Sequence, residues 1–64
     1  MIHIGNYEHY RITVNTTETP TFSVLDMRTK EEVYVGDDDY EAAKQIGLGE
    51  MGFHATIDEI VANG

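Results

Sequence analysis

The chain contains no cysteine, so neither a disulfide nor a thiolate metal site can reinforce the fold of its 64 residues. A domain of this length buries only about 60% of the surface that its unfolded form exposes, and its stability margin is therefore thin. Small secreted domains usually depend on disulfides, so the missing cysteines favour a cytoplasmic protein. The length leaves room for one domain, residues 1–64.

Long apolar runs are also absent. No stretch approaches the ~20 apolar residues that a membrane-spanning helix needs. The N-terminal segment MIHIGNYEHY lacks both the basic and the apolar region of a secretion signal. We therefore expect no membrane insertion and no export through a visible signal.

Positive charge is scarce, because 4 Lys and Arg residues face 12 Asp and Glu residues and the formal net charge is −8. Such a field repels nucleic acid, anionic membranes and acidic substrates, and it steers the protein toward cationic surfaces. The same charge also keeps a small protein soluble, and this role alone would account for it. The composition predicts a cationic partner or, at the least, a soluble domain.

Groups for catalysis or metal binding are few. The single Ser23 lies in an expected strand without a glycine-rich elbow, which argues against nucleophilic catalysis. His3, His9 and His54 have no second histidine at the spacing of zinc-binding helices, and we interpret each as a surface or partly buried residue. The run Asp37–Asp39 lacks the alternation and the glycine of a calcium loop. We expect no enzyme activity, no cofactor and no metal.

Apolar residues alternate with polar ones near the N-terminus. Tyr10, Ile12 and Val14 have the period of two that is typical of a strand with one buried face, and Ile2 and Ile4 continue the same parity. We therefore expect all five side chains to lie on one face of the sheet.

Two more strands follow. The segment 15–21 contains Pro20 and favours a loop, after which the apolar run 22–25 predicts a second strand. After a charged stretch, the β-branched and aromatic residues 33–35 predict a third. These segments predict a three-stranded antiparallel sheet.

A helix is expected after Gly36. Asp38 and Glu41 have the spacing of a capping box, residues 42–46 are mostly good helix formers, and Gly47 is a stop signal. The acids before residue 42 also lie at the positive end of the helix dipole.

The segment 48–55 contains two further glycines and predicts a loop or frayed turns. Thr56 and Glu59 form a second capping-box pattern before an apolar pair, which predicts a short second helix. The fold class is therefore α+β, a three-stranded antiparallel sheet followed by one or two short helices packed on one face, in the order βββα(α). The expected core residues are Tyr10, Ile12, Val14, Phe22, Val24, Val33, Val35, Ala43, Ile46, Leu48 and Ile57.

The segment Ala42–Leu48 resembles the first helix and turn of helix-turn-helix proteins, in which small residues pack between the helices and a glycine makes the corner. The resemblance covers only this segment and implies a recognition helix around residues 50–56. Contacts to bases and phosphates rely heavily on Arg and Lys, and neither occurs after Lys44. A degenerate helix-turn-helix DNA binder is therefore one alternative function, and a helix corner packed on the sheet explains the same residues.

The acidic residues form two groups. Glu31 and Glu32 lie in the loop expected before the third strand, and Asp37–Asp39 with Glu41 follow that strand. At roughly 3.3 Å per residue the two groups would be about 10–20 Å apart, as two acidic poles on one edge of the sheet.

Tyrosines accompany these acids. Tyr34 is expected to point opposite Val33 and Val35, away from the core, and Tyr40 stands beside the acidic helix start. Exposed aromatic rings and carboxylates together recognise Lys and Arg, although the same tyrosines would equally serve to cover a thin core. The candidate partner-binding residues are Glu31, Glu32, Tyr34, Asp37, Asp38, Asp39, Tyr40 and Glu41.

These patterns favour a non-enzymatic regulator or inhibitor that binds a basic protein, in particular a nucleic-acid-binding one, as small acidic DNA-mimic inhibitors encoded by phages do. We expect no direct binding of nucleic acid and no binding of membranes. The first alternative is an antitoxin-like accessory module that forms a homodimer through a sheet edge. The second is the degenerate helix-turn-helix protein.

Overall fold

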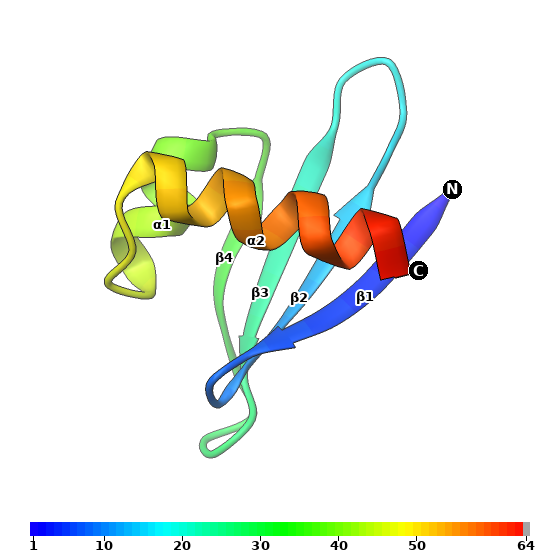
Figure 1. The fold of residues 1–64 in the computed structure, drawn as a ribbon. Helices are drawn as coiled ribbons and strands as arrows, with labels where there is room; N and C mark the ends of the chain where they lie inside the picture. Colours follow the sequence, from blue (N-terminus) through cyan, green and yellow to red (C-terminus); the bar gives the residue numbers. More distant parts are fainter. Residues whose placement is uncertain (64) are drawn as a thin grey trace.

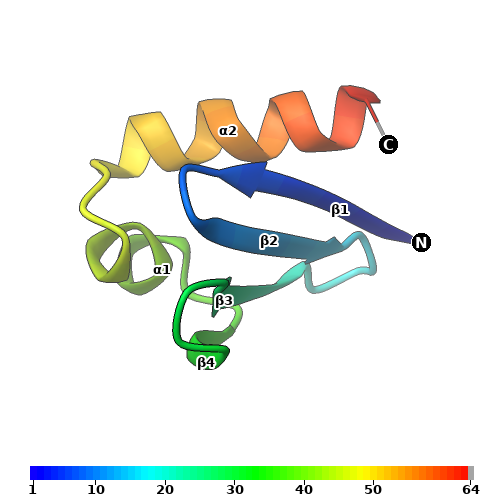
Figure 2. The same ribbon diagram turned by 90° about the horizontal axis from the view of Figure 1, so that it is seen from below.

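The computed structural model describes residues 1–63 and has a four-stranded antiparallel sheet with two helices on one face (Figure 1, Figure 2). The strands follow one another in the sheet in the order β1-β2-β3-β4. The expected α+β class, an antiparallel meander followed by helices, is confirmed, with one strand more than predicted. The elements are β1 (Ile2–Tyr7), β2 (Tyr10–Asn15), β3 (Thr21–Asp26), β4 (Glu31–Gly36), α1 (Asp39–Gln45) and α2 (Glu50–Asn63).

The additional strand is β1. Residues before Tyr10 do not extend β2, as the alternation had suggested, but turn back at Glu8 and His9 and pair with it. Glu8 adopts a left-handed backbone with φ of 53°, which lets so short a connection reverse the chain. The reversal makes β1 an edge strand of the sheet.

This hairpin also changes which side chains of β1 reach the core. Its register places His3 opposite Val14 and Gly5 opposite Ile12, so the odd-numbered residues of β1 face the helices. Ile2 and Ile4 therefore lie on the other face, where they are 63% and 61% exposed, and the expectation that they share a face with Ile12 and Val14 is wrong.

The core lies between the two central strands and the helices. α2 packs mainly on β1 and β2 and α1 on β3 and β4, so each helix covers half of the sheet (Figure 2). Phe53 of α2 is fully buried and meets Phe22 edge to face, with ring centroids 5.6 Å apart. Most expected core residues are confirmed as buried, namely Ile12, Val14, Phe22, Val24, Ala43, Ile46 and Ile57. The unpredicted members are His3, Ala42, Phe53 and Ile60.

A bulge in β4 reverses the expected orientation of Tyr34 and Val35, whereas Val33 packs against the core as expected. Val24 pairs with Tyr34, but Leu25 pairs with Glu32, so Val33 is an extra residue in β4. Tyr34 consequently packs against the core, and the prediction that it points away is wrong. Val35 lies on the opposite face and is 62% exposed, so its expected burial is wrong as well.

α1 ends at the predicted glycine. Gly47 has a φ of +76°, a conformation that costs glycine little. Its N–H donates to Lys44 O over 3.3 Å, and Leu48 N–H donates to Ala43 O over 2.9 Å. These two bonds form a Schellman motif, which satisfies carbonyl groups at the end of the helix.

α2 is a single helix that begins six residues before the predicted start at Thr56, so the expected loop at 48–55 is wrong from Glu50 onward. Thr56 is not a cap, since its Oγ1 donates to Gly52 O within the helix over 2.9 Å. The helix persists through Gly52 because Phe53, Ile57 and Ile60 form one buried stripe against the sheet. Neither helix of residues 1–63 has the length and apolar character needed to cross a membrane.

Candidate functional site

The acidic residues predicted to form two poles lie at the two ends of β4, which is an edge strand. Glu31 and Glu32 are its first two residues, not loop residues as expected, and Asp37 and Asp38 follow its last residue. All four are exposed, and β4 separates the pairs by about 15–20 Å at 3.3 Å per residue. We call these four residues the acidic edge.

The carboxylates of the acidic edge are not neutralised by neighbouring cations. Within residues 1–63, every ion pair involves a histidine, His9 or His54, and none of these pairs includes a residue of the acidic edge. Glu32 has only a neutral partner, because its Oε1 accepts a hydrogen bond from Ser23 Oγ at 2.8 Å. The acidic edge thus presents to solvent a negative charge that no Lys or Arg of residues 1–63 pairs with.

Asp38 has a structural role beside its charge. It is the N-cap of α1, and its Oδ1 accepts hydrogen bonds from the N–H groups of Tyr40 and Glu41 at 3.0 and 3.3 Å. The predicted N-cap is confirmed. The capping box is not completed, because the backbone N–H of Asp38 donates to Tyr34 Oη at 2.8 Å and not to the side chain of Glu41. Tyr34 and Asp38 together fix the junction between β4 and α1.

The cap can be separated from the charge by substitution. Asp38→Ala is expected to lower the free energy of unfolding by about 1 kcal/mol, because two N–H groups lose their acceptor. Asp38→Ser removes the same charge but keeps a capping oxygen, so its stability should stay close to that of the wild type. Urea denaturation followed by circular dichroism measures both, and equal losses in the two variants would contradict the capping role.

Three further residues of the predicted site differ in exposure. Tyr40 is 58% exposed and is the aromatic side chain of α1 that a partner can reach. Glu41 and Asp39 are half-buried. Of the two tyrosines predicted to contact a partner, therefore, Tyr40 is accessible, whereas Tyr34 packs against the core and accepts a hydrogen bond from Asp38 N–H.

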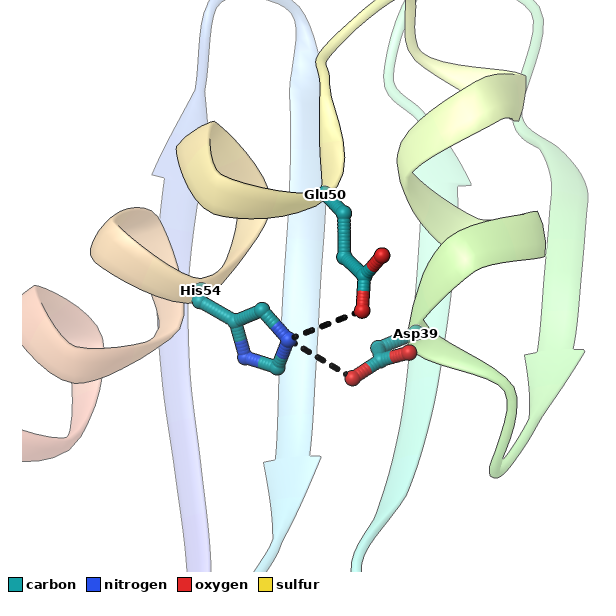
Figure 3. A group of neighbouring side chains, drawn as sticks. All are labelled: Asp39, Glu50 and His54. Atoms are coloured by element: carbon teal, nitrogen blue, oxygen red, sulfur yellow. Dashed lines mark ion pairs between the residues drawn. The ribbon is translucent and has the colours of Figure 1, made fainter.

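Asp39 belongs to a cluster that the sequence did not predict (Figure 3). His54 Nε2 lies 2.8 Å from Asp39 Oδ2 and 3.7 Å from Glu50 Oε1. The cluster joins the first residue of α1 to the first two turns of α2. The spacing of Glu50 and His54, four residues apart, is a signal in the sequence, but it has meaning only if this segment is helical.

The carboxylate of Asp26 accepts hydrogen bonds within the β3–β4 turn. Its Oδ1 accepts hydrogen bonds from Arg28 N–H at 2.9 Å and from Thr29 N–H at 3.4 Å. Burial raises the pKa of this carboxyl, but the two N–H groups and the charges of His9 and Arg28 outweigh it, so the pKa lies below its ordinary value of 3.8. Asp26 therefore stays ionised at neutral pH, and its carboxylate stabilises the β3–β4 turn by accepting these hydrogen bonds.

Comparison with known proteins gives no relative for this chain. No family model, curated protein or solved structure matches it. Its function is therefore inferred from the groups that the fold brings together.

A shallow groove runs between β1 and the C-terminal half of α2. Glu59 is the one ionisable side chain among the residues that line it, so these residues offer no acid–base pair. The lining residues are Ile4, Gly5, Asn6, Thr56, Glu59, Ile60 and Asn63.

The face of the sheet opposite the helices is not covered by any element of residues 1–63 (Figure 2). The strand registers align Ile4, Thr13, Ser23 and Val35 in one row across this open face. Exposed Ile4 and Val35 thus stand at its two sides, and Val35 adjoins the acidic edge. The exposed apolar side chain of Val35 on the open face therefore lies next to the charged residues of the acidic edge.

Proposed function

We propose that the chain is a non-enzymatic binding protein that uses its acidic edge and the adjoining open face to occupy a basic surface of another protein, in particular a nucleic-acid-binding surface in the cytoplasm. The observation that supports this most is that Glu31, Glu32 and Asp37 are exposed along an edge strand without a Lys or Arg partner in residues 1–63. An inhibitor or regulator of such a protein would act by excluding its usual polyanionic ligand.

The surface has the two components of a protein interface. Val35 and Tyr40 supply exposed apolar area, and the carboxylates supply a charged rim. Exposed ion pairs contribute only about 0.2–1 kcal/mol each, so the charges mainly accelerate and orient association, whereas the apolar contacts slow dissociation. Duplex DNA carries its phosphates at regular intervals, and carboxylates at both ends of β4 would compete for the same cationic groove.

The helix-turn-helix alternative has less support. α1, the turn at 46–49 and α2 do follow one another as that resemblance implies. The exposed positions of α2, however, include Glu50, Asp58 and Glu59 and no Lys or Arg. A helix with this charge repels the phosphate backbone, so we do not propose DNA binding.

Self-association through β1 is a second candidate. β1 is an edge strand without charged residues or proline, and Ile2 and Ile4 are exposed on it. Edges of this kind pair readily with another strand, whereas Glu31, Glu32 and the bulge protect β4. A dimer formed in this way would persist at high salt, unlike a charge-driven complex.

The test compares two variants with the same loss of charge. The edge variant is Glu31→Gln/Glu32→Gln/Asp37→Asn, which leaves the Asp38 cap intact. The control is Glu18→Gln/Asp58→Asn/Glu59→Gln, three exposed carboxylates elsewhere on the molecule. Each immobilised protein is offered the heparin-binding proteins of a cell extract at about 50 and about 500 mM salt, with and without duplex DNA.

We expect wild type and control to retain a basic protein at low salt and to release it when salt or DNA is added. The edge variant should retain at least about tenfold less, since several charges act together. Failure of the wild type to retain any such protein would exclude the proposal, and so would equal losses in the edge variant and the control. A species of twice the monomer mass at high salt in analytical ultracentrifugation would instead support the β1 dimer.

A further inference from the structure

We propose that Asp39, Glu50 and His54 bind a divalent transition-metal ion, with Zn²⁺ as the fitting representative, and that the ion links α1 to α2 (Figure 3). The three side chains offer one nitrogen and two oxygen atoms that all lie within 4.8 Å of one another. This inference is independent of the proposed partner, because the ligands lie on the two helices and none belongs to the acidic edge.

The distances between these atoms suit a zinc ion. With Zn–N and Zn–O bonds of about 2.0–2.2 Å, the ligand atoms of a tetrahedral site are about 3.4 Å apart. His54 Nε2 is 2.8 Å from Asp39 Oδ2 and 3.7 Å from Glu50 Oε1, values on either side of that separation. The two printed separations are therefore close to those of one tetrahedral site, and the two carboxylate oxygens lie within 4.8 Å of each other.

The fold holds the three ligands on regular elements. Glu50 and His54 are one turn apart on α2, where residues i and i+4 share a face. Asp39 is the first residue of α1, whose start is fixed by the Asp38 cap. Because α1 and α2 pack against each other, the third ligand is held beside the other two.

The donor set selects the class of metal. An imidazole nitrogen with two carboxylates suits zinc and its first-row neighbours, whereas Ca²⁺ and Mg²⁺ prefer oxygen ligands throughout. The two carboxylates balance the charge of a divalent ion, and the nearby Asp37 and Glu41 add to the negative field. Three protein ligands leave a fourth position for water or for a group of another molecule.

Without a metal, the three groups cannot all bond to one another. Nε2 carries at most one proton, and it is close enough to donate that proton to Asp39 Oδ2. Glu50 Oε1, at 3.7 Å, is then outside hydrogen-bond range. A metal bound to Nε2, with the proton on Nδ1, would engage the nitrogen and both oxygens at once.

The test titrates Zn²⁺ into the purified chain by isothermal calorimetry and follows the histidine ¹⁵N chemical shifts. The wild type should bind one ion and show the largest shift at His54 Nε2. His54→Ala, Asp39→Asn and Glu50→Gln should each weaken binding by at least about tenfold, because even supporting residues of metal sites have effects of that size. The controls are His9→Ala, which removes a histidine paired with a carboxylate elsewhere, and Glu41→Gln, which removes a charge from α1.

A thermal measurement gives a second readout. Free Zn²⁺ at about 100 times the wild-type dissociation constant should raise the Tm of the wild type by at least about 10 °C and that of His54→Ala by no more than about half as much. Absence of saturable binding would overturn the proposal. So would equal affinity in wild type and His54→Ala, or equal binding of Ca²⁺ and Zn²⁺, because either result would indicate a nonspecific attraction by the acidic surface. None of these outcomes depends on a protein partner, so the proposed function stands or fails separately.

Discussion

Replacing Phe53 with alanine is expected to lower the free energy of unfolding by about 3–5 kcal/mol, the largest effect of any single truncation in this chain. The ring of Phe53 is fully buried and contacts Phe22 edge to face, so its loss removes apolar burial and leaves a cavity between α2 and the sheet. A domain of this length has a stability of only about 5 kcal/mol. Phe53→Ala should therefore retain no more than about 2 kcal/mol of that stability.

Urea denaturation followed by far-ultraviolet circular dichroism measures this loss. Met51→Ala is the matched control, because Met51 lies on the same helix but is 87% exposed, and we expect a change within about 0.5 kcal/mol. Phe53→Leu should fall between the two, since it retains most of the apolar volume. A loss below about 1 kcal/mol in Phe53→Ala would mean that α2 is not the helix that closes the core.

Phe53 also shows why the second helix was predicted only in part. Gly49 and Gly52 around it weaken helix propensity, and that local signal favours a loop. The stripe of Phe53, Ile57 and Ile60 outweighs it, because burial against a sheet stabilises a helix more than propensity does. Since α2 was predicted to begin at Thr56, Glu50 and His54 were not placed on one helical face, and the cluster with Asp39 was missed.

Features set by neighbouring residues were predictable. The N-cap at Asp38 and the stop at Gly47 depend on side chains and backbone conformations within a few residues, and both are confirmed. The position of the acidic groups at the two ends of β4 was predictable for the same reason, because these charges immediately flank the apolar residues of the strand in the sequence.

Features set by pairing between strands were not predictable. The hairpin at Glu8 has no Asn-Gly or Asp-Gly signature, and alternation alone does not reveal that the chain reverses there. The bulge at Val33 likewise depends on the register with β3, and it exchanges the faces of Tyr34 and Val35. Each error moves side chains between the core and the open face, so the open face could be recognised only in the structure.

The consequence of the unpredicted hairpin can be tested at Gly5. The hairpin directs Gly5 toward α2, and a Cβ atom there would overlap Ile60 Cγ1 and lie 2.9 Å from Ile60 Cδ1 and 3.2 Å from Ile60 Cβ. Ile60 is buried, so its side chain cannot swing into solvent and α2 must move. Gly5→Ala is therefore expected to lower the free energy of unfolding by about 1–3 kcal/mol, the usual cost of overpacking.

A double-mutant cycle with Ile60→Ala identifies the cause. Ile60→Ala removes Cγ1 and Cδ1 and costs stability by itself, so both backgrounds are measured by urea denaturation in an osmolyte that keeps them folded. In the Ile60→Ala background Gly5→Ala should cost less than about 0.5 kcal/mol, because the two closest atoms, Cγ1 and Cδ1, are gone. The control Gly52→Ala, whose Cβ would meet only Leu48 at 3.5 Å on an exposed helix position, should stabilise the chain by up to about 1 kcal/mol. An equal cost of Gly5→Ala in both backgrounds would show that β1 does not lie under Ile60, and the exposed position of Ile2 and Ile4 on the open face would then be wrong too.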